Sequence, residues 1–354
     1  MGGSAARVLR RLDRLYTIGG GRGANRIGGS VEEQEAHDVT AGWMEEAALE
    51  VEVDPDGNLI GRLRGSRPEL AEIWTGSHLD SVPGGGRFDG ALGVVAGLEA
   101  LERIGPQPRT LAVVAFRDEE RGCAGSRALV ARGGPLPGAY VEAHVEQGPL
   151  LERRGAPLGV VTGIVAYARD TVVIEGRVGH AGTTPMDARE DALCAAAELV
   201  LAIRDAARAI DAAVATVGRL EVEPGAANVV PGRVRLTLDA RAPDDDRLEA
   251  LLAEIGKHVN VGGERTPAVA MGREPTAVLR GAVHDLGLPA VELVSGAGHD
   301  AGILAAAGVP AAMLFVRSLA GGISHSPEEE TSPEDVADCV DALAETLARL
   351  ARMP

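Results

Sequence analysis

Short segments without charged residues alternate with a helical pattern over the first third of the chain. Residues 111–116 are an uninterrupted apolar run and residues 73–77 a short uncharged one, both typical of buried strands, and residues 90–104 between them predict a helix. Residues 31–48 also have a helical pattern, with Ser30 as its N-cap. A strand, a helix and a second strand in this order predict a parallel sheet, whose carboxyl ends are expected to carry the chemistry.

Between residues 168 and 277 the pattern changes to half-polar strands and two amphipathic helices. The expected elements are, in order, a strand at 171–178, a helix at 187–213, strands at 215–224 and 233–241, and a helix at 244–258. Strand, helix, strand, strand, helix is the order of a small ferredoxin-like α+β unit.

Alternating strands and helices return after residue 280. We expect strands at 288–294 and 311–316, with a helix near 300–307 between them. A final helix begins at Pro333, with Ser332 as its N-cap. Its apolar stripe, which should face the core, consists of Val336, Val340, Leu343, Leu347 and Leu350.

A chain of 354 residues is long enough for two domains, and the changes of pattern place the second inside the first. We predict an α/β catalytic domain of residues 1–167 and 278–354, with a mainly parallel central sheet flanked by helices. Residues 168–277 are predicted to form an inserted ferredoxin-like α+β domain.

Charge and composition narrow the range of partners. A net charge of −17 and a pI near 5.0 argue against binding to nucleic acid or to anionic membranes. No uncharged apolar run reaches membrane-spanning length, and the start of the chain lacks the apolar core of a secretory signal. Cys123, Cys194 and Cys339 have neither paired nor metal-type spacing, which suggests a reducing compartment. We therefore expect a cytoplasmic protein.

Three common kinds of chemistry are disfavoured by what the sequence lacks. Lys257 is the only lysine, and it falls within an expected amphipathic helix, which disfavours Schiff-base and P-loop chemistry. The absence of a G-x-S-x-G motif disfavours a serine hydrolase.

The segment GSHLDSVPGGGRFDGALGV carries half of a candidate two-metal site. His78 and Asp80 are two residues apart, so their side chains leave the same face of an extended backbone. A carboxylate placed there can accept a hydrogen bond from the second nitrogen of a metal-bound imidazole. Glycines 84–86 allow a tight turn that returns Asp89 to the same point, where its two oxygens can bridge two cations.

Adjacent acidic residues follow the expected strand at 111–116. Neighbouring side chains point apart, so one of Glu119 and Glu120 can bind a metal while the other faces the substrate. A carboxylate beside metal-activated water is a suitable general base. The alternative is that Asp118, Glu119 and Glu120 form a solvated acidic turn.

Two histidines complete the candidate set. His144 lies in VEAHVEQGPLL after an expected strand, and His325 lies in the loop GGISHSPEE ahead of the final helix. Taken alone, His144 is equally explained as a structural histidine and His325 as an ordinary loop residue. Taken together with the carboxylates, and without thiolates, they suit a pair of hydrolytic Zn²⁺, Mn²⁺ or Co²⁺ ions.

Five segments carry a more specific resemblance. They are GSHLDSVPGGGRFDGALGVVAGLEAL, EAHVEQGPLLE, GHAGTTPMDAR, SGAGHDA and GGISHSPEEETSPED. In this order they resemble the hydantoinase/carbamoylase family of binuclear zinc amidohydrolases, over about residues 12–352. That family contains N-carbamoyl-L-amino acid hydrolases, allantoate amidohydrolases and ureidopropionases, and its wider superfamily includes aminoacylase-type and carboxypeptidase G-type enzymes.

The resemblance implies two divalent metal ions per subunit, with Zn²⁺ as the first choice and Mn²⁺, Co²⁺ or Ni²⁺ as alternatives. The implied ligands are His78, Asp89 and His144 for one ion, and Asp89, Glu120 and His325 for the other. The family pattern further implies that Asp80 orients His78 and that Glu119 is the general base.

The resemblance also assigns substrate contacts. Arg241 and Asn228 would grip a substrate carboxylate, and His180 would reach the active site of a partner subunit and stabilise the oxyanion. Gln147 and His299 would lie around the carbamoyl or ureido end. The inserted domain would then be a lid and a dimerisation domain. The alternatives are that Arg241 pairs with Asp239 at the end of a strand and that Asn228 makes a turn.

The implied reaction is hydrolysis of a linear C–N amide bond in a small carboxylate, first of all an N-carbamoyl-L-amino acid to the L-amino acid, CO₂ and ammonia. Alternatives are an allantoate amidohydrolase or ureidopropionase, a metal-dependent peptidase or deacylase, and a non-catalytic binding protein on the same fold. Two departures from the family pattern would reshape the substrate pocket. Arg121 stands where family members usually have glycine after two glutamates, and residues 126–140 form a shorter stretch than usual.

Overall fold

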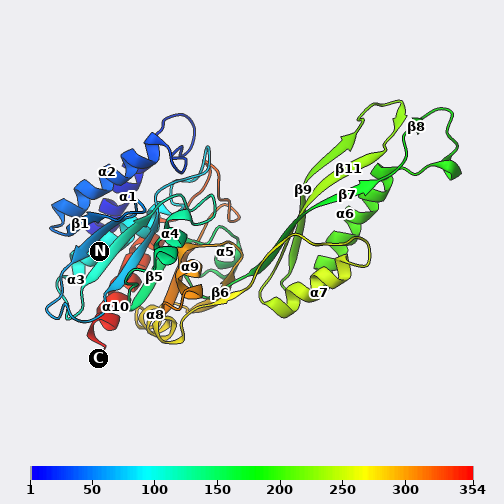
Figure 1. The fold of residues 1–354 in the computed structure, drawn as a ribbon. Coiled ribbons are helices and arrows are strands. Elements are labelled where there is room, and N and C mark those ends of the chain that lie inside the picture. The colour runs from blue at the N-terminus through cyan, green and yellow to red at the C-terminus, as the bar shows by residue number, and fades with distance from the viewer. Residues whose placement is uncertain (1, 354) are drawn as a thin grey trace. The chain divides into compact units, whose positions relative to one another are not determined.

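The computed structural model describes residues 2–353 and divides them into two compact units (Figure 1). One unit consists of the chain up to Gly163 and from Ala270 onward, and the other of Ile164–Val269. Both boundaries fall a few residues before the expected positions at 167/168 and 277/278.

A nine-stranded sheet forms the centre of the first unit within the described residues. The strands are β1 (Glu50–Val53), β2 (Leu59–Leu63), β3 (Ile73–His78), β4 (Leu111–Phe116), β5 (Ala139–Val145), β6 (Leu158–Ile164), β13 (Val269–Ala270), β14 (Val291–Ser295) and β15 (Ala311–Val316). Their order is β1-β2-β4-β3-β5-β15-β6-β13, with β14 beside β6. The central strands β4, β3, β5 and β15 are parallel, while β2 and β6 are antiparallel to their neighbours β4 and β15. The predicted mainly parallel α/β sheet is therefore confirmed.

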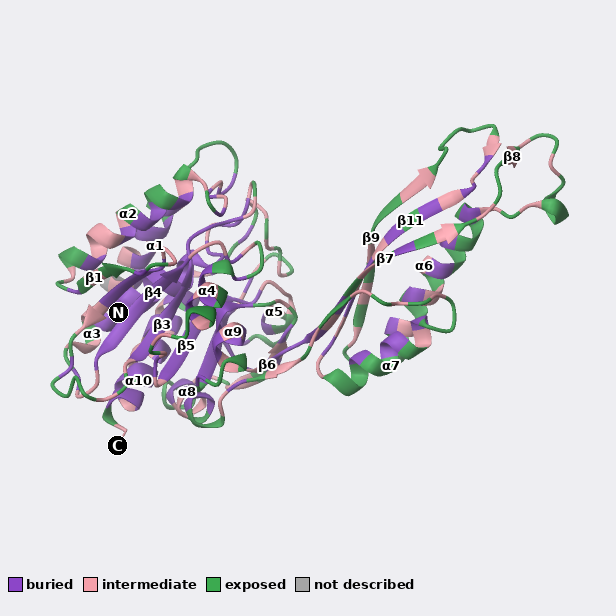
Figure 2. Cartoon of the chain, in the orientation of Figure 1, coloured by how far each residue is buried: buried purple, intermediate pink, exposed green. Residues whose placement is uncertain are grey.

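Helices cover both faces of this sheet (Figure 1). One face packs against α1 (Gly2–Tyr16), α2 (Val31–Glu46), α3 (Ala91–Ile104), α8 (Arg273–Asp285) and α10 (Pro333–Arg352), which share an apolar core with alternate strand residues. The remaining helices are α4 (Ala124–Arg132) and α9 (Asp300–Ala306), which contact each other, and the short α5 (Leu150–Arg154). Because β3, β4, β5 and β15 are covered on both faces, they are buried along their whole length (Figure 2).

Both predicted helix caps in this unit are confirmed. The Ser30 hydroxyl accepts a hydrogen bond from the backbone N–H of Glu33, and Ser332 accepts one from Asp335. Each hydroxyl satisfies a backbone donor that lacks a partner within its helix. The predicted apolar stripe of α10, from Val336 to Leu350, is buried at all five positions.

The second unit has its own sheet and its own apolar core. Its elements are β7 (Ala166–Glu175), β8 (Gly179–His180), α6 (Ala192–Ala209), β9 (Val214–Glu223), β10 (Val229–Val230), β11 (Arg233–Ala242), α7 (Asp245–Ile255) and β12 (Glu264–Thr266). The main sheet has the order β12-β7-β11-β9 with antiparallel neighbours, and β8 pairs with β10. Four antiparallel strands with two crossover helices in this order form a ferredoxin-like α+β unit.

Helix α6 is shorter than the predicted helix at 187–213, so that prediction was wrong at both ends. Residues Met186–Ala188 form a separate 3₁₀ turn. The carboxylate of Asp191 then accepts hydrogen bonds from the backbone N–H groups of Leu193 and Cys194. An N-cap side chain of this kind starts a helix, so α6 begins after Asp191.

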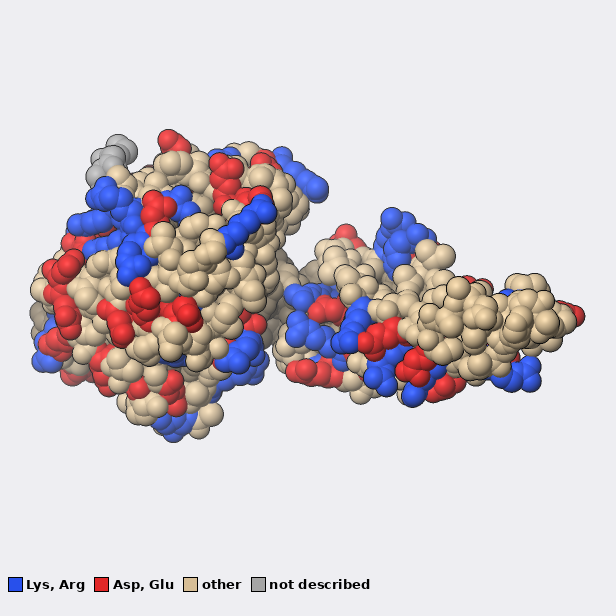
Figure 3. Space-filling view, turned by 90° about the horizontal axis from the view of Figure 1, so that it is seen from above, with Lys and Arg blue, Asp and Glu red and all other residues tan. Residues whose placement is uncertain are grey.

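Charged side chains of both signs are interspersed over the face of each unit drawn in Figure 3. Ion pairs also occur within the first unit: Arg62 bridges Glu52 and Glu72, and Arg7 pairs with the buried Glu99. Among residues 2–353, no helix is long and apolar enough to cross a membrane.

Candidate metal centre

The expected metal ligands lie at one edge of the central sheet. His78 ends β3, Glu120 follows β4, and His144 is the penultimate residue of β5, inside the strand and not after it. Asp89 precedes α3, and His325 lies between β15 and α10. Because β3, β4 and β5 are parallel, their carboxyl ends meet, and this is where α/β sheets bind ligands.

Asp89 stands between two groups of ligand atoms. Its Oδ1 lies 3.2 Å from Nε2 of His144 and 3.9 Å from Nε2 of His78. Its Oδ2 lies 3.3 Å from Nε2 of His325, which is also 3.4 Å from Oε2 of Glu120. Within each triad the ligand atoms are within 4.8 Å of one another. The structure thus brings the five expected ligands together as two triads that share Asp89.

The donor atoms fit divalent cations. All are imidazole nitrogens or carboxylate oxygens, which suit Zn²⁺, Mn²⁺ or Co²⁺. Oε1 of Glu120 is buried and has no hydrogen-bond partner within the described residues, as expected of a ligand atom. Nδ1 of His78 lies 3.2 Å from Oδ1 of Asp80, and Nδ1 of His144 lies 2.9 Å from the carbonyl oxygen of Val145. These contacts hold one nitrogen of each ring and leave Nε2 for a cation.

Asp89 also governs the protonation of the two histidines nearest to it. Its hydrogen bond raises the pKa of His325 to about 9. Burial is the largest single influence on the pKa of His144 and lowers it, but the hydrogen bond to Asp89 and the negative charges of Asp89 and Glu142 together raise that pKa to about 9. The protons occupy nitrogens that a cation needs, so cation binding and proton release are linked.

Glu119 lies beside both triads without belonging to either. Its Oε2 is 3.8 Å from Nε2 of His78, and its side chain is 10% exposed. Burial raises the pKa of Glu119 to about 7, and the negative charge of Glu120 acts in the same direction. A carboxylate with a pKa near neutrality can both accept and return a proton.

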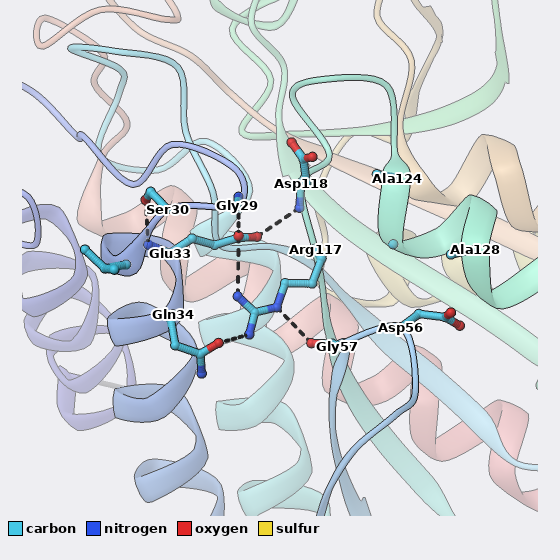
Figure 4. A pocket seen from close by; sticks show the side chains of 12 residues that line it. Gly29, Ser30, Glu33, Gln34, Asp56, Gly57, Arg117, Asp118, Ala124 and Ala128 are labelled. Atoms are coloured by element: carbon cyan, nitrogen blue, oxygen red, sulfur yellow. Dashed lines mark hydrogen bonds and ion pairs between the residues drawn. The ribbon is translucent and has the colours of Figure 1, made fainter.

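Two buried carboxylates hold the turn that carries Glu119 and Glu120. Asp80 accepts hydrogen bonds from the backbone N–H groups of both residues, at 3.0 and 3.1 Å. Glu33 accepts one from the N–H of Asp118 at 2.9 Å, seen in Figure 4 from an adjacent pocket. Asp118 has a φ of 51°, a left-handed conformation that a non-glycine residue keeps only when its surroundings enforce it.

Glycine is required directly after Asp89. Gly90 has a φ of 61°, and a Cβ atom there would lie 2.3 to 2.5 Å from ring atoms of His78. Any side chain at this position would therefore displace a metal ligand.

Gln147 and His299 also lie at the metal centre. Nε2 of Gln147 donates a hydrogen bond to Oδ2 of Asp89 at 3.1 Å. The ring centroid of His299 is 4.5 Å from that of His144, and its Nε2 is 3.0 Å from the Ser295 hydroxyl. Nδ1 of His299 is buried without a hydrogen-bond partner among the described residues.

The three remaining expected contacts belong to the second unit. His180 is exposed on β8, and the carbonyl of Asn228 accepts a hydrogen bond from the backbone N–H of Ala181 at 2.9 Å. Arg241 forms two hydrogen bonds to Asp239, at 2.7 and 3.0 Å. The alternative role predicted for Arg241, pairing with Asp239 at the end of a strand, is therefore observed.

Arg121 has a largely exposed side chain that binds Asp118, in the turn that carries Glu119 and Glu120. Its guanidinium grips the carboxylate of Asp118 through two hydrogen bonds, at 2.7 and 2.6 Å, and its side chain is 61% exposed. Arg121, which departs from the family pattern, therefore stabilises the turn that carries Glu119 and Glu120 from its solvent-exposed side.

Sequence reasoning missed several buried carboxylates around the site. Glu142 accepts hydrogen bonds from the Ser77 hydroxyl and the backbone N–H of Ala301, and Asp300 accepts one from the Ser126 hydroxyl. A glutamate inside the apolar segment AYVEAHV was the available signal, because such residues are rarely buried without a partner. Glu146, two residues after His144, accepts hydrogen bonds from the backbone of α5.

The chain also matches a known protein family. Residues 74–349 match the model of peptidase family M20/M25/M40. The chain belongs to this family. The M20/M25/M40 match includes every residue of both triads, from His78 to His325.

Individual proteins similar to the chain give a more specific comparison. The chain is 38% identical to an N-carbamoyl-L-amino acid amidohydrolase from Geobacillus stearothermophilus, over 98% of each protein. It is 34% identical to an allantoate amidohydrolase from Escherichia coli K12, over 87% of this chain and 88% of that protein. An amidase of the hydantoinase/carbamoylase family from Burkholderia multivorans has a TM-score of 0.88 at 30% identity, covering 99% and 98% of the two chains. The resemblance to the hydantoinase/carbamoylase family is confirmed, and the chain is a hydrolase of this type.

Proposed function

We propose that the chain is a metal-dependent amidohydrolase that converts an N-carbamoyl-L-amino acid to the L-amino acid, CO₂ and ammonia. The observation that carries this proposal is the pair of triads sharing Asp89, with Glu119 beside them. The choice of substrate is supported by the relative that is 38% identical and named for that activity. An allantoate amidohydrolase is the second candidate, supported by the relative that is 34% identical.

The residues of the metal centre would have two roles, cation binding and proton transfer. His78, Asp89 and His144 would hold one divalent ion, and Asp89, Glu120 and His325 the other. When bound, such ions act as Lewis acids and lower the pKa of water. Glu119 would remove a proton from the attacking water and return it to the departing nitrogen.

The substrate would be oriented by polar groups at its two ends. Gln147 and His299, which lie against Asp89 and His144, would contact the carbamoyl end. Arg241 would bind the α-carboxylate, because a guanidinium matches a carboxylate with two parallel hydrogen bonds. Asp239 now occupies that position, so the substrate would have to share or displace it.

The layout of the second unit supports a dimer. Arg241 pairs with Tyr167 at one end of the β11–β7 ladder, and Arg233 pairs with Glu175 at the other. The segment that carries His180 continues from the Glu175 end. Eight residues of strand span roughly 25 Å at about 3.3 Å per residue, which is too far for one small substrate. His180 and Asn228 would therefore contact a substrate in a different site from Arg241, which requires a second copy of the chain.

An exposed strand edge offers a surface for that dimer. β9 is the last strand of its sheet, and Val214 and Leu220 on it are 56% and 40% exposed. Leu201 on α6 is 51% exposed. An unpaired edge with apolar side chains favours association with a second copy. Sedimentation analysis should show a dimer, and a fully active monomer would contradict this arrangement.

A substrate panel with metal analysis on the same sample tests the proposed function. Chelator-treated protein, reloaded with Zn²⁺, Mn²⁺, Co²⁺ or Ni²⁺, should give its highest kcat/KM with an N-carbamoyl-L-amino acid. A preference for allantoate or ureido acids would select the second candidate. A preference for dipeptides or N-acyl amino acids would instead indicate a peptidase or deacylase. Hydrolysis of none of these would favour a binding protein.

A further inference from the structure

Glu329 joins the two loops that carry Asp89 and His325. Its Oε1 accepts hydrogen bonds from the backbone N–H groups of Phe88, at 2.7 Å, and of Asp89, at 3.0 Å. Its Oε2 accepts one from the hydroxyl of Ser324, at 2.8 Å. Glu329 is 5% exposed and lies 240 residues from Asp89 in sequence. One buried carboxylate therefore ties the shared metal ligand to the residue next to His325.

The backbone at Gly86 lies close against the carboxylate of Glu329. A Cβ atom at Gly86 would lie 2.2 Å from the carboxyl carbon and Oε1 of Glu329, and 2.4 Å from Oε2. No real side chain tolerates such distances, so the backbone at Gly86 passes directly over the carboxylate. The position of the Glu329 carboxylate therefore requires that residue 86, in a distant segment of the chain, has no side chain.

The two cation sites differ in how firmly their ligands are held. His78 and His144 lie at the ends of buried strands, with side chains 1% and 2% exposed. His325 lies in a loop, has a φ of 53°, and its side chain is 51% exposed. The site of Asp89, Glu120 and His325, called here the second cation site, therefore depends on contacts that fix its loop.

We propose that Glu329 is a positioning residue whose hydrogen bonds hold Asp89 and the His325 loop in register for the second cation. The inference rests on the two-ion centre of the proposed function and goes beyond it, because Glu329 belongs to neither triad. Its hydrogen bonds perform this role, and its negative charge is not required. The first cation site would retain its ligands His78 and His144 without Glu329, because neither histidine forms a hydrogen bond with Glu329 within residues 2–353.

Titration of the metal-free, full-length protein with Co²⁺ tests this, using calorimetry and the visible absorption of bound Co²⁺. We expect Glu329→Ala to weaken the second Co²⁺ site by about 10- to 100-fold and the first site by less. Glu329→Gln should bind both ions much as the wild type does, because its amide oxygen can still accept the two N–H bonds and its amide nitrogen can donate to Ser324. Glu330→Ala, an exposed position on the same loop, is the matched control and should leave both sites unchanged.

Three outcomes would overturn the proposal. Wild-type binding of the second Co²⁺ by Glu329→Ala would show that the contact is dispensable. Equal losses in Glu329→Gln and Glu329→Ala would show that charge matters and hydrogen bonding does not. Equal weakening of both sites together with a lower Tm of the metal-free protein would show a general structural role. If Glu329→Ala does not fold, Glu329→Asp, whose shorter arm cannot reach both loops, takes its place.

Gly86→Ala provides an independent test, because the φ of Gly86 lies outside the left-handed region and only the added methyl group is at issue. Alone, it should weaken the second Co²⁺ site as Glu329→Ala does. Combined with Glu329→Ala, it should cause no further loss, since the methyl group then meets no carboxylate. Additive losses would contradict the proposal. A wild type that binds fewer than two Co²⁺ ions would contradict the two-ion centre and this inference together.

Discussion

The carboxylate of Asp80 accepts a hydrogen bond from the backbone N–H of Glu119 at 3.0 Å. The same oxygen lies 3.2 Å from Nδ1 of His78. One side chain therefore orients a metal ligand and holds the turn that presents the proposed base. The position of the base and the geometry of the first cation site are consequently coupled through Asp80.

Replacing Asp80 with asparagine should reveal both roles. The amide nitrogen cannot accept a hydrogen bond, so in one orientation of the amide both His78 and the N–H of Glu119 lose their acceptor, and in the other orientation the N–H of Glu120 loses it. We expect metal affinity to fall by about 10- to 100-fold, and kcat to stay reduced when metal is saturating. Competition titration and steady-state kinetics measure the two effects, with Asp38→Asn on the exposed face of α2 as control. Full recovery of kcat by added metal would limit Asp80 to the orientation of His78.

Removal of the charge on Glu119 should abolish turnover and spare the metals. Glu119 lies outside both triads, so Glu119→Gln should keep the metal content of the wild type. Loss of a general base lowers kcat by about 10²- to 10⁴-fold. Glu120→Gln is the contrasting variant, because it changes a ligand and should lose metal. A Glu119→Gln variant with kcat within a few-fold of the wild type would show that the base is another group.

Loss of Arg241 should act mainly on KM. If its guanidinium binds the substrate carboxylate equally in the ground and transition states, Arg241→Ala raises KM by about 10- to 100-fold with little change in kcat. Arg169→Ala is a matched control, because Arg169 also pairs with Asp239, at 2.9 Å. An unchanged KM in Arg241→Ala, or an equal rise in both variants, would assign Arg241 to the support of its strand.

His37 should make the protein sensitive to acid. Burial lowers its pKa from the ordinary 6.5 to about 3, and the positive charge of Arg117 acts in the same direction. As the pH falls below 6.5, the unfolded chain therefore binds a proton that the folded protein does not, and stability declines until about pH 3. At about pH 5 the loss is on the order of 2 kcal/mol.

Substitution of His37 by phenylalanine tests this linkage. Neither ring nitrogen of His37 has a hydrogen-bond partner among the described residues, so an apolar ring of similar shape forfeits no hydrogen bond. Urea unfolding of the metal-free proteins at pH 7 and pH 5 should show a smaller pH dependence in His37→Phe than in the wild type. His258→Gln, at an exposed histidine, should retain the wild-type dependence. Identical pH dependence in His37→Phe and the wild type would mean that His37 titrates normally in the folded protein.

Features with local causes were predictable from the sequence. Ser30 and Ser332 cap their helices because each hydroxyl lies within reach of a nearby backbone N–H. The strand at Leu111–Phe116 follows from an apolar run that only a sheet covered on both faces can bury. The start of α6 was misplaced because Asp187 and Asp191 are both of a residue type that favours helix N-caps, and the hydrophobic pattern does not choose between them; only Asp191 caps a helix in the structure.

The sequence by itself determined the kinds of donor atom, imidazole and carboxylate, and their order along the chain, because both are properties of the chain. Tertiary structure alone decided which oxygen of Asp89 faces His144 and which faces His325. It also decided that Glu329 lies beneath Gly86, a contact between segments more than 200 residues apart. Such contacts depend on how helices and strands pack around a common core, and no local pattern of polar and apolar residues records that packing.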